Sequence, residues 1–382
     1  MKAEEIKPLN HEKKVEYLEL IYDLIFVYMI GRNNTLLQNF ENGFVSPKAF
    51  FAYVLCTLAI IQIWNFTTFY INMFGRNGVR EHIFLCVNMY LMYFIGESTR
   101  SDWYQYQTQY HIAWGLILVN IGIQYLIEKR NHKMDFWNQD LIHRMSITLF
   151  VEAALVFIAA IPVPLLGEVF SALAIAAGIG LTAFSRKKSI SGSNTDFPHL
   201  TERAMLYVVF TFGEMIIAVA TYFTGGGSFS WNTIYYSLMA FLIVVGLFLS
   251  YEIIYDKLIN REGEYDGMLY LVVHIFIIFA LTNITASLEF MHEAEIALFP
   301  KILFLAISVV AYFAFLFALK GYVKVSCKTD KHFMITLGCV TAAFIILMLI
   351  LREQMMINIL ITVVYVFSIF AVLYMAGKHT DK

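Results

Sequence analysis

An acidic side chain stands in the middle of a long apolar stretch of this sequence. Residues 204–223 are apolar enough and long enough to cross a bilayer, yet Glu214 lies halfway along them. A carboxylate near the centre of a membrane is costly, so it normally faces a polar interior rather than lipid. On an α-helix, Arg203 and Glu214 are about 16 Å apart along the axis and roughly 20° apart around it. The spacing predicts that they share one helix face, which we interpret as part of a polar interior site.

Other ionisable residues also fall inside apolar stretches. Glu16, Glu19 and Asp23 are spaced as one stripe on a helix. We expect Glu16 to be solvated at the helix start and Asp23 to face the protein interior, sharing a site with Glu214. The residues that we expect to bind and transfer protons or solutes are Glu214, Asp23, Glu152, His274, Arg203, Glu202 and Glu19.

A second set of residues is polar but uncharged. Asn65, Thr68 and Asn72 recur at helical spacing, and Tyr270 precedes His274 by one turn. Such side chains either join neighbouring helices by hydrogen bonds or line a polar path, and the sequence leaves both readings open. His274 is either a core residue with satisfied hydrogen bonds or part of a proton relay. Glu97 and Glu289 lie near helix ends, where simple solvation is an equal explanation.

Composition identifies the class of protein that carries these residues. Hydrophobic residues make up 59% of the 382 and charged residues 15%, with a mean hydropathy of +0.65. A soluble domain has about 25% charged residues, so the sequence predicts an integral membrane protein. The net charge is −2 and no basic domain suggests nucleic acid. We therefore expect an all-α polytopic membrane bundle surrounded by lipid.

Twelve apolar segments are candidate membrane spans. They cover about 17–37, 49–73, 81–97, 109–128, 145–161, 165–184, 204–223, 233–255, 268–290, 299–319, 333–351 and 354–376. With this count, 22 of the 27 Lys and Arg residues fall on the side that holds both termini. Positive charge marks the cytoplasmic side, so both termini are predicted to be cytoplasmic.

The twelve segments divide into two sets of six. Their corresponding starts are separated by roughly 190 residues, as in the parallel repeats of some transporters. We predict an N-terminal half at 1–184, a cytoplasmic linker at 185–202 and a C-terminal half at 203–382. Within the sixth segment, Ala172, Ala176 and Gly180 recur every four residues and predict a close-packing face.

Motifs for enzymatic chemistry are not found. The sequence has no paired-His metal motif, no nucleophile elbow and no nucleotide fingerprint. We therefore expect no cofactor, no metal site and no enzymatic activity. The sequence leaves open whether the chain forms a homodimer.

Three segments resemble the low temperature requirement A (LtrA) family of bacterial membrane proteins. They are Leu18–Val27, Trp64–Asn72, and His199–Arg203 with Phe212–Glu214. Tyr270, His274 and Glu289 also fit the family's pattern, so the resemblance spans most of the chain. It implies a multi-pass protein of the bacterial cell membrane and no established reaction or substrate.

Buried acids with a histidine are typical of proton and cation pathways. The leading hypothesis is a proton-linked transporter of an unknown small solute or ion, with Glu214 at its centre. The alternatives are an ion channel with an acid-lined pore and, ranked last, a membrane-embedded enzyme acting on lipid.

Overall fold

The computed structural model describes residues 13–131, 136–163, 165–184, 195–220, 222, 230–263, 265, 267–324 and 331–378. These ranges contain twelve long α-helices, which confirms the all-α expectation. They are α1 (Tyr17–Asn33), α2 (Pro47–Phe74), α3 (Val79–Ser98), α4 (Trp103–Asn131), α5 (Phe136–Ala159), α6 (Leu166–Phe184), α7 (Phe197–Ala220), α8 (Trp231–Ile253), α9 (Met268–Phe290), α10 (Leu298–Ala318), α11 (Lys331–Ile350) and α12 (Met355–Lys378). Each predicted span coincides with one helix.

Ten of the helices in the described ranges are long and apolar enough to cross a membrane, and α1 and α3 are the two that are not among them. Both nevertheless turn an apolar face outward. On α1 this face carries Tyr17, Ile21, Leu24 and Tyr28, and on α3 it includes Ile83, Val87 and Tyr90. Because most of their charged and polar side chains point inward, α1 and α3 have the outer surface of membrane helices, and their crossing of the membrane stays a prediction.

The local sequence explains where several elements begin. Ser46 caps α2 by accepting a hydrogen bond from the Ala49 amide at 3.3 Å, and Pro47 follows in the first turn, where a missing N–H costs nothing. Between α1 and α2, a short hairpin joins β1 (Phe40–Glu41) to β2 (Phe44–Val45). Its turn residues Asn42 and Gly43 both have positive φ, as a tight hairpin turn requires. The sequence analysis did not predict this hairpin.

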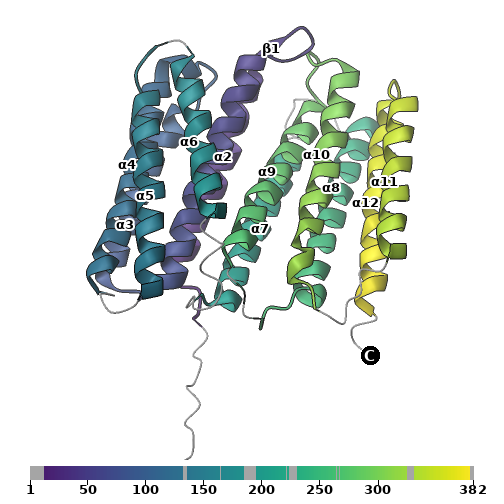
Figure 1. Cartoon of the computed structure of the whole chain (residues 1–382). Helices are drawn as coiled ribbons and strands as arrows, with labels where there is room; N and C mark the ends of the chain where they lie inside the picture. Colours follow the sequence, from purple (N-terminus) through teal and green to yellow (C-terminus); the bar gives the residue numbers. More distant parts are fainter. Residues whose placement is uncertain are drawn as a thin grey trace, which may run out of the picture.

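The helices lie side by side in a broad bundle (Figure 1). Helices α3, α4, α5 and α6 gather on one side and α8, α10, α11 and α12 on the other. Between these groups, α1 packs against α7, and α2 packs against α7 and α9. The first helix of each predicted half therefore meets the other at the centre of the molecule.

The same order of neighbours recurs in the two predicted halves. Helix α1 packs against α2 and α3 as α7 packs against α8 and α9, and the pairs α2–α6 and α3–α4 correspond to α8–α12 and α9–α10. This recurrence is an argument for a duplication, although the division into halves stays a prediction. Residues 185–194 of the predicted linker lie outside the described ranges.

The predicted close-packing face of α6 is wrong. Ala176 is exposed, and a Cβ atom built on Gly180 meets no described atom within 4 Å. The glycine in close contact is Gly178, where a Cβ would lie 1.8 Å from Nε2 of Gln62. The regular spacing of small residues identified a face of the helix but did not show which face turns inward.

Candidate functional site

The largest group of buried charges joins α1 to α7. Arg203 is fully buried and donates from Nη2 to Oδ1 of Asp23 at 2.6 Å and from Nε to Oδ2 at 3.1 Å. A third donor, Nη1, bonds to Oε2 of Glu19. The indole of Trp64 in α2 donates to Oδ1 of Asp23 at 2.8 Å. Together with His199, these residues form what we call the Arg203 cluster.

Hydrogen bonds from α2 set the orientation of His199. The Asp196 amide donates to Oδ1 of Asn72 at 3.2 Å, and Nδ2 of Asn72 donates to the Asp196 carbonyl at 2.7 Å. These two bonds identify the oxygen and nitrogen of the Asn72 amide. The same Nδ2 lies 3.0 Å from Nδ1 of His199, which must therefore be the acceptor. The ring proton is then on Nε2, which lies 3.5 Å from Oε2 of Glu19.

Glu214 belongs to a different contact. Its carboxylate lies against α1 at Gly31, where an added Cβ would be only 2.1 Å from Oε1 of Glu214. Arg203 and Glu214 thus both face α1, as their spacing predicted. The expectation that Asp23 shares a site with Glu214 is wrong. Gly31 is eight residues beyond Asp23, about 12 Å along the helix, and Asp23 is paired with Arg203 instead.

The acid that accompanies Glu214 is Glu289 in α9. Oε2 of Glu289 accepts a hydrogen bond from Nδ2 of Asn34 at 3.1 Å, Gly31 against Glu214 lies three positions before Asn34, and α7 packs against α9. Gly31 lies in the last turn of α1 and Asn34 follows directly after the helix, three positions further on, so both contacts are made at the same end of α1. Solvation was an equal explanation for Glu289, but the residue is only partly exposed. We call these two acids the Glu214–Glu289 pair.

Glu152 forms a third polar contact, between α5 and α2. It is fully buried, and its Oε2 accepts a hydrogen bond from Nε2 of Gln62 at 3.3 Å. Both groups lie over Gly178 of α6. The acids predicted on helices 1, 5 and 7 therefore occupy separate contacts rather than one central site.

His274 has the environment of a core histidine. Its Nδ1 lies 2.8 Å from the Tyr270 carbonyl and its Nε2 lies 3.1 Å from the Tyr251 hydroxyl. The carbonyl can only accept, so Nδ1 carries the proton and Nε2 accepts from Tyr251. Both ring nitrogens of the neutral imidazole are thereby bonded. Its proposed place in a proton relay remains a prediction.

Comparison with known families supports the resemblance seen in the sequence. The model described as "Bacterial low temperature requirement A protein (LtrA)" matches residues 14–369. The chain belongs to the LtrA family. No curated protein and no solved structure matches it. The family match covers all three polar contacts described above.

Other predicted site residues of this LtrA-family chain are placed differently. Asn72 is part of the bonds around the Arg203 cluster, whereas Asn65 and Thr68 are buried and their Nδ2 and Oγ1 atoms have no hydrogen-bond partner among the described residues. Glu202 is exposed. The Tyr270 hydroxyl is buried without a partner in the described part of the chain.

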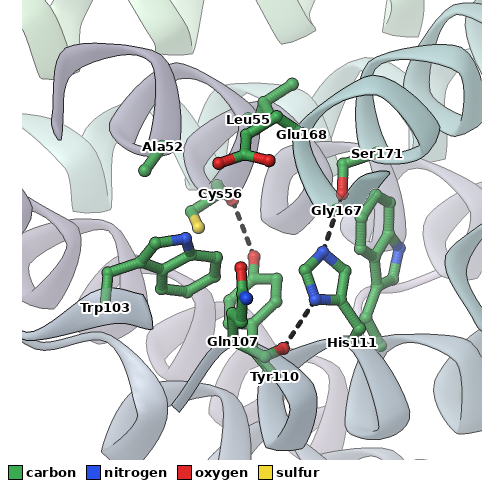
Figure 2. Close-up of a pocket in the computed structure, with 11 residues that line it drawn as sticks. Ala52, Leu55, Cys56, Trp103, Gln107, Tyr110, His111, Gly167, Glu168 and Ser171 are labelled. Carbon is green, nitrogen blue, oxygen red and sulfur yellow. Dashed lines mark hydrogen bonds between the residues drawn. The ribbon is translucent and has the colours of Figure 1, made fainter. Parts of the chain in front are cut away.

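A small cavity of the LtrA-family protein lies between α2, α4 and α6, as Figure 2 shows. His111 bonds through Nε2 to Oγ of Ser171 at 2.7 Å and through Nδ1 to the Gln107 carbonyl at 2.6 Å. The Tyr110 hydroxyl donates to the Cys56 carbonyl at 3.1 Å. The cavity volume of about 10 Å³ has room for about one water molecule. We assign it no function.

Metal ligands do not gather in the described ranges of this LtrA-family protein. There, no group of three or more His, Cys, Asp or Glu residues is arranged to hold a metal ion.

Proposed function

We propose that this LtrA-family protein is a proton-linked membrane transporter of a small solute or ion, in which Glu214 takes up and releases the proton. The observation that carries the proposal is the position of Glu214. Its carboxylate is only partly exposed within a membrane-spanning helix, and no basic side chain of the described part of the chain acts on it. An unpaired acid is costly in a membrane and is typically retained for a functional reason.

The neighbouring acid gives Glu214 a way to exchange a proton or a cation. Two neighbouring carboxylates do not both ionise readily, so uptake of a proton or a cation by one of them is favoured. Glu289 is oriented by Asn34, whereas Glu214 rests on Gly31, which offers no side chain. The Glu214 carboxylate is thus free to change partners during a transport cycle.

The Arg203 cluster has a different role in this proposal. Arg203 bonds to both acids of α1, and these bonds leave Asp23 with no need of a further cation. The cluster holds α1 against α7 near the start of both helices. Glu214 lies further along α7, against Gly31 of α1 and with Glu289 of α9 nearby, so it can change its contacts without breaking the cluster.

Reconstituted vesicles test the proposal. The purified protein is placed in liposomes that contain a pH-sensitive dye, and a pH gradient is imposed. We expect flux with the unchanged protein and loss of the pH-driven component in Glu214→Gln. Glu252→Gln is the matched control, since Glu252 is an exposed acid of α8. Undiminished flux in Glu214→Gln would contradict the proposal, and unitary currents in a planar bilayer would favour the channel instead.

We also propose that the protein lies in the bacterial cell membrane with both termini in the cytoplasm. Twelve crossings return the chain to the side where it began. Most Lys and Arg residues fall on that side, and positive charge is retained in the cytoplasm.

A further inference from the structure

Glu152 is a buried acid without a counter-charge among the described residues. It is fully buried in α5, and no charged side chain of the described ranges acts on it. This contrasts with Asp23, which is equally buried but faces the guanidinium of Arg203. An isolated carboxylate in an apolar interior is unfavourable unless it gains a proton or a cation.

Several buried oxygen atoms around Glu152 have no hydrogen-bond partner among the described residues. Oε2 of Glu152 accepts the hydrogen bond from Gln62, but Oε1 of Glu152 and Oε1 of Gln62 have no partner among the described residues. Both side chains are at most 2% exposed. Thr182 lies one turn beyond Gly178 on α6, and its buried Oγ1 is also without a partner in the described part of the chain. While Glu152 is ionised, both Oε1 atoms can only accept, so they need a hydrogen-bond donor or a cation, and the buried negative charge favours a cation.

The backbone of α6 provides the space for this arrangement. A Cβ atom on Gly178 would lie 1.8 Å from Nε2 of Gln62 and 2.1 Å from Oε2 of Glu152. Any side chain at this position would displace the amide and the carboxylate. At Gly180, two residues further on, no described atom lies within 4 Å of the Cβ position, so a side chain there would displace neither Gln62 nor Glu152.

We propose that Glu152 and Gln62 bind one monovalent cation, either a proton or a sodium ion, at their Oε1 atoms, while Gly178 leaves room for the bond between Gln62 Nε2 and Glu152 Oε2. One carboxylate balances one positive charge, and oxygen ligands suit hard cations such as sodium. A divalent ion would leave an uncompensated charge in the membrane interior. The role of this site in a transport cycle rests on the proposed transport function. In that cycle, Glu152 would be a second ion site, distinct from Glu214.

Titratable groups on the helices packed around Glu152 belong to other contacts. On α4, His111 and Tyr110 form hydrogen bonds beside the small cavity between α2, α4 and α6, and Glu128 pairs with Arg80 of α3. On α6, Glu168 lines the same cavity as His111. None of these groups acts on Glu152, whose own carboxyl group is the one that the labelling measures.

Carbodiimide labelling measures this site directly. A hydrophobic carbodiimide reacts with protonated carboxyl groups, and mass spectrometry of the digested full-length protein locates the product. We expect labelling at Glu152 that decreases as pH rises. If sodium binds, adding sodium chloride in place of choline chloride at fixed pH will slow the labelling; if only protons bind, it will have no effect. Both results support the proposal and identify the cation.

Two glycine variants make the test specific. Gly178→Ala is expected to shift the pH dependence of labelling or abolish sodium protection, whereas Gly180→Ala is expected to preserve the unchanged protein's behaviour. Glu214→Gln is expected to retain labelling at Glu152, which separates this proposal from the transport proposal. If Glu152 is unlabelled at every pH in protein with an unchanged melting temperature, or is labelled at a rate independent of both pH and sodium, the proposal is overturned.

Discussion

The guanidinium of Arg203 in α7 meets the carboxylate of Asp23 in α1 through two hydrogen bonds, 2.6 Å from Nη2 to Oδ1 and 3.1 Å from Nε to Oδ2. Both side chains are fully buried. The pair joins the first helix of one predicted half to the first helix of the other. A planar guanidinium can make such a two-point contact, whereas an ammonium group cannot.

Arg203→Ala is expected to destabilise the protein strongly. It would leave Asp23 and Glu19 buried without a counter-charge, and removing one partner of a buried pair costs about 3–5 kcal/mol. Arg203→Lys should have an intermediate effect, because one ammonium cannot reproduce both contacts with Asp23 and the bond to Glu19. The melting temperature in detergent measures both effects.

Arg100→Ala is the control for that measurement, since Arg100 forms an exposed pair with Glu97. Surface pairs contribute about 0–1 kcal/mol, so the melting temperature should change little. Equal melting temperatures for Arg203→Ala and Arg100→Ala would show that the buried pair does not hold α1 to α7.

Gly31→Ala is expected to impair transport through Glu214. The new methyl group would lie 2.1 Å from Oε1 of Glu214, so the carboxylate must move. We expect pH-driven flux into vesicles to fall by about tenfold or more, since displacements of this size at a reacting group have large effects. Gly213→Ala has no described atom within 4 Å of its Cβ and should retain flux. A larger loss of flux in Gly213→Ala than in Gly31→Ala would argue against a role for the Gly31 contact.

The neutral form of His199 is expected to carry its proton on Nε2. Nδ1 faces the Nδ2 donor of Asn72 and cannot also be protonated without losing that bond. Nitrogen NMR of protein labelled in histidine distinguishes the two tautomers. Asn72→Asp replaces the donor with an acceptor beside the Asp196 carbonyl, and should destabilise the protein by about 1–3 kcal/mol. A proton on Nδ1 of His199 in the unchanged protein would contradict the assignment.

His292, in the connection between α9 and α10, is expected to make stability sensitive to mild acid. Partial burial, and then the charge of Lys301, lowers the pKa of His292. The unfolded chain protonates this residue near its usual pKa of about 6.5, above the folded value. Stability is therefore lost as pH falls from about 6.5 through the lower, folded pKa.

The difference between melting temperatures at pH 7.5 and 5.5 tests this expectation. The difference should be smaller in His292→Phe, which keeps an aromatic ring near Tyr222 but cannot titrate. In the unchanged protein, the ring centroids of His292 and Tyr222 lie 3.8 Å apart. An equal difference in both proteins would assign the pH dependence to other groups.

The topology can be tested by labelling single cysteines in intact cells. In a background without native cysteines, a membrane-impermeant reagent should leave a cysteine at position 190 unlabelled and should label one at position 42, in the hairpin turn after α1. Position 190 lies outside the described ranges, and its predicted location comes from the distribution of Lys and Arg. Labelling at position 190 from outside would refute the twelve-crossing topology.

Much of the fold follows from the sequence alone. Long apolar runs need helices in a membrane, because only internal hydrogen bonding satisfies the backbone there. This requirement accounts for the agreement between the predicted spans and the observed helices. Inward positions of Asp23 and Glu152 were also predictable, since an acid with apolar neighbours on a membrane helix avoids lipid. The family followed from motifs in three of the helices.

Only the tertiary structure decided which buried groups meet. Periodicity gives the face of each helix, but not the rotation and depth at which that face meets a helix far away in the chain. Asp23 therefore pairs with Arg203 rather than sharing a site with Glu214, and the acid near Glu214 is Glu289 of α9. Gly178 rather than Gly180 faces the interior for the same reason. Side chains interact over a few ångströms, and contacts at that scale depend on the packing of whole helices.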